Sequence, residues 1–246
     1  IDDRAGNRYA SMTDASGTDH PVASTLDVLD RLHDLGILSE RDLFAKRALL
    51  RESGCALIPV RPDEALLAAK DLSVVDADVE EGYFSRTLRE SIQLLKISRY
   101  VALPLEEFWL TSTASAFRKA ITSLWGTDGR TGDDERANWL FHLGKFSEFS
   151  ASFLGDFDAR RGLMQEALEV ARYLVDPSLT HNHAYWSWVE HNLCQPLLEE
   201  RPAVFSLLLE VLKSQLLRLK NEYPKELREL LKMAEDDASR DLAAIA

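Results

Sequence analysis

Hydrophobic residues in the first 80 positions follow both helical and strand-like spacings. Apolar positions recur every three to four residues over 26–32 and again over 40–53, and Asp63 has the side chain of an N-cap for a third helix. Residues 55–60 read Cys-Ala-Leu-Ile-Pro-Val, a short apolar run that predicts a strand. Because Pro59 has no N–H to donate, this strand is expected at a sheet edge. The patterns together predict a small α/β segment.

Acidic side chains crowd the stretch from Asp71 to Glu81, where no apolar stripe is available for burial. A polar stretch of this kind is typical of a connection on the protein surface. We therefore expect two domains, one formed by residues 1–80 and one by residues 81–246.

Beyond this stretch the apolar positions follow the 3.6-residue period of amphipathic helices. The positions expected to face a core are Leu88, Ile92, Leu95, Leu105, Phe108, Trp109, Ala116, Ile121, Leu124, Trp139, Leu140, Leu143, Phe146, Leu163, Ala167, Val170 and Leu174. Breaks are expected in the loop 126–132, at Pro177, near Pro196 or Pro202, and at Pro224. No fixed repeat is present, so a regular solenoid is not supported. The predicted fold class is mostly α: a partial α/β segment followed by an all-helical domain of about seven helices.

The composition is that of a globular protein with a sizeable core. The chain has 246 residues, of which 46% are apolar and 28% charged, and its formal net charge is −12. This acidic balance argues against broad electrostatic binding to nucleic acid or to an anionic membrane, so any contact with RNA is expected to be local. Cys55 and Cys194 are expected to be free thiols in a reducing compartment. No apolar stretch has the length of a membrane span and no basic segment leads into a signal core, so we expect a cytoplasmic protein.

The opening residues carry the first candidate chemistry. The sequence starts at Ile1 without a methionine, which leads us to expect a piece of a longer protein. Asp2 and Asp3 follow as they would at the end of a buried strand, which places carboxylates at the edge of a parallel sheet where α/β folds bind ligands. The alternative is structural: the same pair can cap a helix N-terminus, with Arg4 in solvent. The sequence alone leaves both interpretations open.

Together with Ser24–Leu29, Leu35–Leu38 and the strand-like Ala56–Pro59, this opening resembles the C-terminal half of a PIN-type ribonuclease domain. The resemblance covers residues 1 to about 70, under a third of the chain. It implies a three-layer α/β domain whose clustered carboxylates hold Mg²⁺ or Mn²⁺. In such a site the metal activates water for cleavage of a phosphodiester and neutralises charge that develops on the phosphate.

The same resemblance assigns the site residues. Asp2 and Asp3 occupy the place of the acidic residue after the family's fourth strand, which makes them the expected catalytic residues and metal ligands. Arg4, Ser24 and Thr25 are the expected substrate-binding residues, because the two hydroxyls match the turn that opens the family's next helix. The family's first aspartate and central glutamate would lie upstream, so we expect the metal site to be incomplete here. The hydroxyl turn also fits the ordinary role of a helix cap.

A second group of metal-type side chains consists of His181, His183, Glu190, His191 and Cys194. On a helix, three of them share one stripe, which permits a common ligand face. Their spacing matches no zinc signature, and the aromatic residues between them have the spacing of a core. Structural histidines are therefore the favoured interpretation.

The helical domain also offers candidate surfaces for a partner or for RNA. Its five tryptophans are expected to pack in the core, with a partner groove as the alternative: Trp109, Trp125, Trp139, Trp186 and Trp188. Its basic residues could form a local RNA surface or a solvated face: Arg99, Arg118, Lys119, Arg130, Arg136, Arg160, Arg161 and Arg172. The loop Gly126–Asp134 lacks the spacing and the lysine of a phosphate-binding loop, so we interpret it as a connector.

Two functions follow from these observations. The first is a metal-dependent PIN-like endoribonuclease, a hydrolase in which Asp2 and Asp3 supply part of the magnesium or manganese site and the helical domain positions RNA or a protein partner. The alternative is a non-catalytic helical scaffold or interaction module within a larger, bacterial-type protein. Fold resemblance speaks more for architecture than for present chemistry, so both hypotheses are carried forward.

Overall fold

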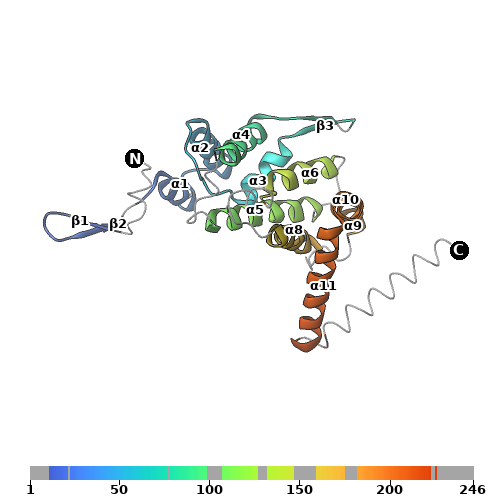
Figure 1. Ribbon diagram of the computed structural model, residues 1–246. Coiled ribbons are helices and arrows are strands. Elements are labelled where there is room, and N and C mark those ends of the chain that lie inside the picture. Colours follow the sequence, from blue (N-terminus) through green and yellow to red (C-terminus); the bar gives the residue numbers. More distant parts are fainter. Residues whose placement is uncertain are drawn as a thin grey trace. The chain divides into compact units, whose positions relative to one another are not determined.

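The computed structural model describes residues 11–21, 23–76, 78–98, 107–126, 132–146, 159–174, 182–222 and 225. The chain divides into two compact units, Ile1–Leu154 and Gly155–Ala246, which are described one at a time. Helices form most of the described residues, which confirms the prediction of a mostly α protein (Figure 1). Strands among them form only two short antiparallel pairs, so the α/β part of the prediction is not confirmed. Within the described ranges, no helix is both long and apolar enough to cross a membrane.

Among the described residues of the first unit, a hairpin comes first. It consists of β1 (Ser11–Thr13) and β2 (Asp19–Pro21), and Met12 lies opposite His20. The carboxylate of Asp14 organises its turn by accepting hydrogen bonds from the Ser16 hydroxyl at 2.5 Å and from the backbone N–H groups of Ser16 and Thr18 at 2.8 and 3.0 Å. The Ser16 hydroxyl and the His20 ring, with smaller help from the Thr18 amide, hold the pKa of Asp14 well below its usual value.

Three helices follow: α1 (Thr25–Asp34), α2 (Glu40–Glu52) and α3 (Pro62–Lys70). Ser24 and Ser39 cap the first two, each accepting the N–H of the aspartate three residues later. The predicted cap at Asp63 is wrong by two residues, because Arg61 is the N-cap of α3 and Pro62 occupies its first turn. Proline suits that position, since its missing N–H would have no partner in the helix.

The strand expected over residues 55–60 is absent, and the segment instead forms an irregular connection between α2 and α3. Leu57 has a φ of +60°, in the left-handed region, which breaks the extended backbone a strand requires. The Pro59 carbonyl accepts a hydrogen bond from the Arg47 side chain rather than from a neighbouring strand. Ile58 and Val60 are nevertheless buried, so the alternation of apolar side chains reflects burial without a sheet.

The acidic stretch expected to join two domains forms the hairpin of β3 (Ser73–Val75) and β4 (Asp78–Glu80). Arg136 donates to the Leu72 carbonyl at 3.3 Å, and Glu81 accepts from the Trp139 indole at 3.0 Å. These contacts attach both ends of the hairpin to the helix that begins at Asp133. The division expected at residue 80 therefore falls inside the first unit.

The rest of the first unit consists of α4 (Tyr83–Ile97), α5 (Glu107–Trp125) and α6 (Asp133–Gly144). Helix α3 packs on α4, α5 and α6, and α5 packs on α6. The predicted core positions that the structure buries here are Leu88, Ile92, Leu95, Trp109, Ala116, Ile121, Leu124, Leu140, Leu143 and Phe146. Gly144 lets α6 approach α5, because a Cβ on this residue would lie 2.9 Å from the Cβ of Phe117.

The second unit contains α8 (Ala159–Leu174), α9 (His183–Val189), a π-helical turn (Glu190–Cys194), α10 (Gln195–Glu200) and α11 (Pro202–Glu222). Its core includes Tyr185 and Trp188, and the Tyr185 hydroxyl donates to the Tyr173 carbonyl at 2.7 Å. The break predicted at Pro202 is confirmed. Pro196 instead lies in α10 directly after the π turn, where the Gln195 N–H bonds to the Glu190 carbonyl.

Candidate functional site

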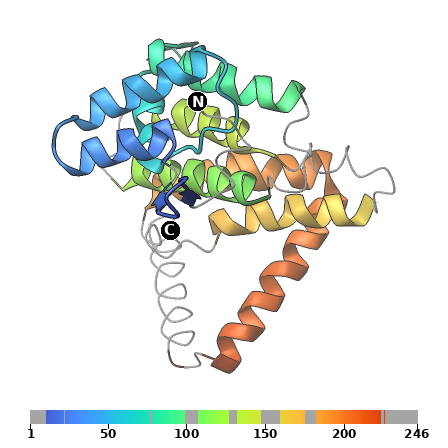
Figure 2. The same ribbon diagram turned by 90° about the vertical axis from the view of Figure 1, so that its left-hand side faces the viewer.

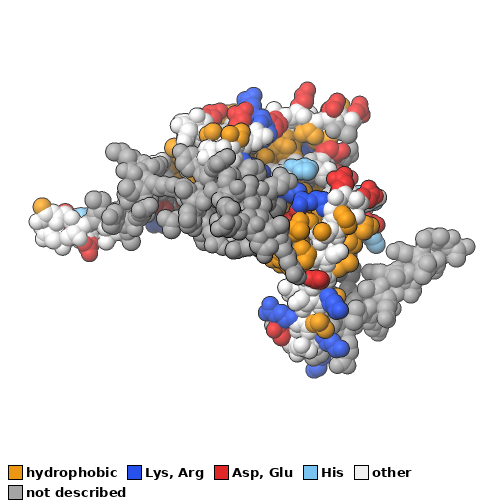
Figure 3. Space-filling view, viewed as in Figure 1, with side chains coloured by type: hydrophobic (Ala, Val, Ile, Leu, Met, Phe, Trp, Pro, Cys, Tyr) orange, Lys and Arg blue, Asp and Glu red, His pale blue; other side chains and the backbone are white. Residues whose placement is uncertain are grey.

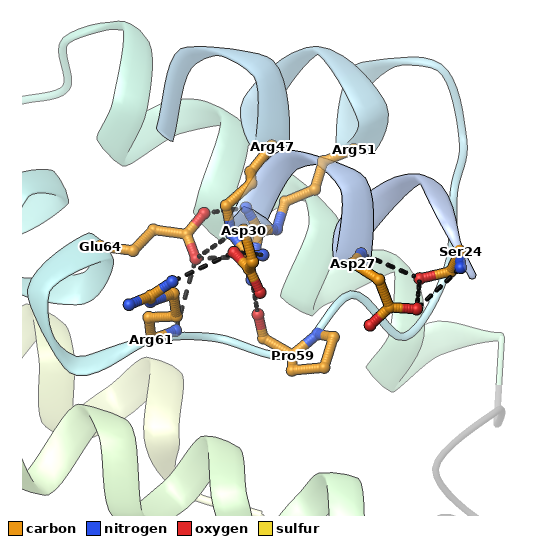
Figure 4. A network of polar contacts seen from close by, with 8 residues as sticks. All are labelled: Ser24, Asp27, Asp30, Arg47, Arg51, Pro59, Arg61 and Glu64. Carbon is orange, nitrogen blue, oxygen red and sulfur yellow. Dashed lines mark hydrogen bonds and ion pairs between the residues drawn. The ribbon is translucent and has the colours of Figure 1, made fainter. Parts of the chain in front are cut away.

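A buried cluster of charged residues joins the first three helices and the connection before α3 (Figure 4). Arg47 and Arg51 project from α2 towards Glu64 of α3. Arg47 Nε and Arg51 Nη2 each lie 3.2 Å from Glu64 Oε2, and Arg51 Nη1 donates to the other carboxylate oxygen. Both arginine side chains are 2% exposed and that of Glu64 is 7% exposed. A single carboxylate therefore serves two buried guanidinium groups.

The cluster is completed at the protein surface by Asp30 of α1 and by Arg61. Asp30 accepts a hydrogen bond from Arg61 Nη1 at 3.1 Å and lies 3.9 Å from Arg47 Nη1. Burial by itself would raise the pKa of Glu64, but the guanidinium groups of Arg51 and Arg47 outweigh it, so the pKa is lowered. Glu64 is therefore ionised at neutral pH, and the cluster fixes α1, α2 and α3 to one another.

A pocket of about 460 Å³ lies between α2, α3 and the start of α4. The residues that line it are Glu40, Arg41, Phe44, Asp63, Leu66, Leu67, Lys70, Asp71 and Phe84. Phe44 is buried and Leu66, Leu67 and Phe84 are half-buried, so the pocket has apolar walls. Four exposed side chains at its rim carry both signs of charge, with Glu40 and Asp63 acidic and Arg41 and Lys70 basic. Its volume is in the range typical of small-molecule and side-chain binding sites.

Asp71 forms one wall of the pocket and also caps α4. Its Oδ2 atom accepts the N–H groups of Phe84 at 2.8 Å and of Ser85 at 3.3 Å, which are donors that the first turn of a helix leaves without partners. Gly82 makes this approach possible, because a Cβ there would lie only 2.4 Å from Oδ2 of Asp71. The end of α3 and the start of α4 are thus held together by one carboxylate.

We expect Gly82→Ala to displace the Asp71 carboxylate and to lower the free energy of unfolding by about 1–2 kcal/mol, the usual cost of a lost cap. Urea denaturation monitored through the exchange of α4 amides measures the change. Gly126→Ala is the matched control, since its Cβ would meet nothing closer than 3.5 Å and should cost little. Equal losses in the two variants would show that Asp71 does not cap α4 in solution.

The residues predicted from the PIN-like resemblance are placed only in part. Asp2, Asp3 and Arg4 lie outside the described residues, so the predicted metal ligands have no structural description here. Ser24 is the N-cap of α1, where it exchanges hydrogen bonds with the Asp27 carboxylate and backbone, and Thr25 opens the helix at the surface. Within the described ranges, no group of three or more His, Cys, Asp or Glu residues could hold a metal ion.

The second candidate group is not brought together as a ligand set among the residues described. His183 and His191 are exposed, and His191 Nδ1 lies 2.7 Å from the Ser187 carbonyl oxygen. Cys194 is half-buried, and this burial, reinforced by the charge of Glu190, raises the pKa of its thiol. His181 lies outside the described residues. A thiol with a raised pKa is mostly protonated at neutral pH and is therefore a poor nucleophile.

The predicted core tryptophans are buried in three cases of five. Trp109, Trp125 and Trp188 are buried as expected, whereas Trp139 and Trp186 are only half-buried. Arg136 donates to the Leu72 carbonyl and lies near Asp133, so it holds the first unit together. The other basic residues predicted for an RNA surface are divided between the two units or are not described.

Sequence reasoning missed both the charged cluster and the pocket. A signal for the cluster was present: Arg47 and Arg51 lie four residues apart beside the apolar positions of α2, and Glu64 precedes the small residues of α3. Charged side chains at core positions of two neighbouring helices indicate a buried ion pair. No comparable signal marks the pocket, because its walls come together only when three helices pack.

Comparisons with models of protein families, with curated proteins and with solved structures found no match. The interpretation of the site therefore rests on its own residues and geometry.

Proposed function

We propose that this chain is a helical interaction module that binds a short peptide segment of a protein partner in the α2–α3–α4 pocket. The observation that carries the proposal is the pocket itself, in which apolar walls lie beneath a rim of both charge signs. Such a site can accept one large apolar side chain and position it through neighbouring charged groups. This is how grooves on helical domains commonly recognise peptides.

The rim charges support a peptide over a nucleic acid. Glu40 and Asp63 balance Arg41 and Lys70, so the rim offers a phosphate backbone no net attraction, and the whole chain is acidic with a net charge of −12. A peptide that carries one basic and one acidic residue beside its apolar anchor matches both signs. The proposed ligand is therefore a short zwitterionic segment with a single leucine-sized or aromatic anchor.

The buried cluster supports the same role by making the pocket rigid. Arg47, Arg51 and Glu64 connect two of the three helices that form its walls, and Asp71 connects the second to the third. When a ligand binds to a preformed pocket, fewer side chains have to become ordered, so the entropic cost of binding is smaller. The arrangement is consistent with a binding site that exists before its partner arrives.

Selection from displayed peptides of about 12 residues, followed by fluorescence polarisation with the enriched peptides, tests the proposal. We expect the double variant Arg41→Glu, Lys70→Glu to weaken binding at least tenfold, about 1.4 kcal/mol, because both rim cations are replaced by acids. Lys46→Glu is the matched control, because Lys46 is also an exposed cation of α2 but does not line the pocket. The proposal fails if no peptide is enriched, or if the enriched peptides bind both variants alike.

Metal-dependent RNA cleavage stays a separate hypothesis, because its expected ligands Asp2 and Asp3 are not described. Release of fluorescence from a labelled RNA in Mn²⁺, compared between the wild-type chain and its Asp2→Asn and Asp3→Asn variants, tests it. Cleavage that disappears with either substitution would favour the nuclease, with the helical pocket then serving to recruit a partner.

A further inference from the structure

Helix α11 carries an apolar stripe that is half-buried at Phe205 and Leu212 and exposed at its other positions. Phe205, Leu209, Leu212 and Leu216 follow one another at spacings of four, three and four residues, which places them on one face of the helix. Leu209 and Leu216 are 52% and 51% exposed, and the adjacent Leu217 is 52% exposed. We call these five residues the α11 stripe.

The two halves of α11 differ in their packing. Val204, Leu207 and Leu208 in the first half are buried, and this half packs on α8 and α10. From Lys213 to Glu222 every side chain that is described is exposed, and this part of the helix extends beyond α8 (Figures 1 and 2). A helix of about ten residues is marginal in water without tertiary contacts. The exposed leucines therefore indicate a surface that is covered in the working protein.

The charges around the stripe indicate an acidic occupant. Lys213, Arg218 and Lys220 lie on this half of α11, and basic side chains gather around its end in Figure 3. The acidic residue of the same half, Glu222, already accepts hydrogen bonds from Arg218 at 3.0 and 3.1 Å. A second copy of α11 would therefore bring basic side chains to a basic surface, which disfavours self-association through this face.

We propose that residues 226–246 of the same chain cover the α11 stripe as an antiparallel amphipathic helix. Their sequence has apolar residues at helical spacing, at Leu227, Leu230, Leu231 and Ala234. The segment contains six acidic and three basic residues, so its net charge is opposite to that of the second half of α11. It thus supplies both the apolar face and the acidic flanks that the stripe requires.

The connection between the two segments suits this arrangement. Pro224 is the second residue after the end of α11. Proline does not continue a helix, because it lacks the N–H and its ring clashes with the preceding turn. A turn of a few residues is enough to return a chain antiparallel to the helix it has left. The segment therefore starts beside the surface it is proposed to cover, and little chain entropy is lost when it docks.

Hydrogen exchange of the full chain, followed by mass spectrometry, tests the proposal. In the wild-type chain we expect slow exchange for peptides within 226–246, and in Leu216→Glu an exchange about tenfold faster or more. Peptides that contain Trp188 or Val204 should exchange at the wild-type rate. Leu198→Glu is the matched control, because Leu198 is equally exposed, at 55%, on α10 and away from the stripe.

A second variant distinguishes loss of docking from general unfolding of the second unit, which Leu216→Glu could also cause. Lys213→Glu combined with Lys220→Glu changes only exposed side chains and should also accelerate exchange in 226–246, because the acidic segment then meets acids. Rapid exchange of this segment in the wild-type chain would overturn the proposal, as would protection that neither variant reduces. Protection that disappears on dilution would assign the stripe to a second copy of the chain instead.

Discussion

Replacing Glu64 by glutamine should lower the free energy of unfolding of the Ile1–Leu154 unit by about 3–5 kcal/mol, the range measured when one partner of a buried ion pair is removed. Glutamine keeps the shape but not the charge, so Arg47 and Arg51 would remain buried with no full negative charge between them. Urea titration read out by the exchange of α2 and α3 amides isolates this unit from the other. Glu80→Gln, on the exposed strand β4, is the control and should change stability by less than about 0.5 kcal/mol.

The same substitution should remove part of the acid sensitivity of this unit. The pKa of Glu64 is lowered in the folded protein, so its contribution to stability is complete above the unfolded carboxyl pKa of about 4.3. That contribution is lost as the pH falls through the lowered pKa. The wild-type chain and Glu80→Gln should both lose it on acidification, whereas Glu64→Gln has nothing of this kind to lose. If Glu64→Gln is as stable as the wild-type chain at neutral pH, the prediction is wrong. That result would show that water reaches the guanidinium groups of Arg47 and Arg51.

Trp188→Ala should destabilise the second unit by about 3–5 kcal/mol, because it removes the largest side chain of this core and leaves a cavity. Trp188 is 1% exposed. The centroid of its ring lies 5.9 Å from the ring centroid of Tyr185 and 6.2 Å from that of Tyr173. The change is measured by urea denaturation with exchange of α8 and α11 amides as the readout.

Trp186→Ala is the control for this prediction, since Trp186 lies on the same helix but is only half-buried. We expect it to cost distinctly less than the change at Trp188. Similar losses at both positions would mean that the two rings contribute equally to the core. In that case the expectation that the buried ring of Trp188 stabilises this core more than the half-buried ring of Trp186 would be wrong.

Local signals in the sequence predicted local structure well. The hydroxyl turn of Ser24 and Thr25 fits a helix cap in the sequence, and Ser24 does cap α1, because a cap depends on residues within one turn of each other. The stripe of Leu88, Ile92 and Leu95 likewise faces the core, since helical period and burial are directly linked.

The prediction failed where distant residues decide the outcome. Residues 55–60 have the composition of a strand, but the side chain of Arg47 takes the Pro59 carbonyl and Leu57 adopts a left-handed conformation. The pocket was missed for the same reason, because Phe44, Leu67 and Phe84 meet only after three helices pack. A pattern read along the chain contains no information on which helix faces which.

The carboxylate that links α3 to α4 has a practical consequence for protein engineering. Asp71 Oδ2 lies 2.8 Å from the backbone nitrogen of Phe84. This hydrogen bond joins the end of α3 to the start of α4, so the two ends of the β3–β4 hairpin are held close together. The turn at Asp76 is exposed, and its neighbours Val75 and Asp78 are also exposed. Extra sequence at such a tip is tolerated because the anchor points do not move and longer loops cost little closure entropy. An epitope or a fluorescent reporter is best inserted there, where it leaves the helical packing undisturbed.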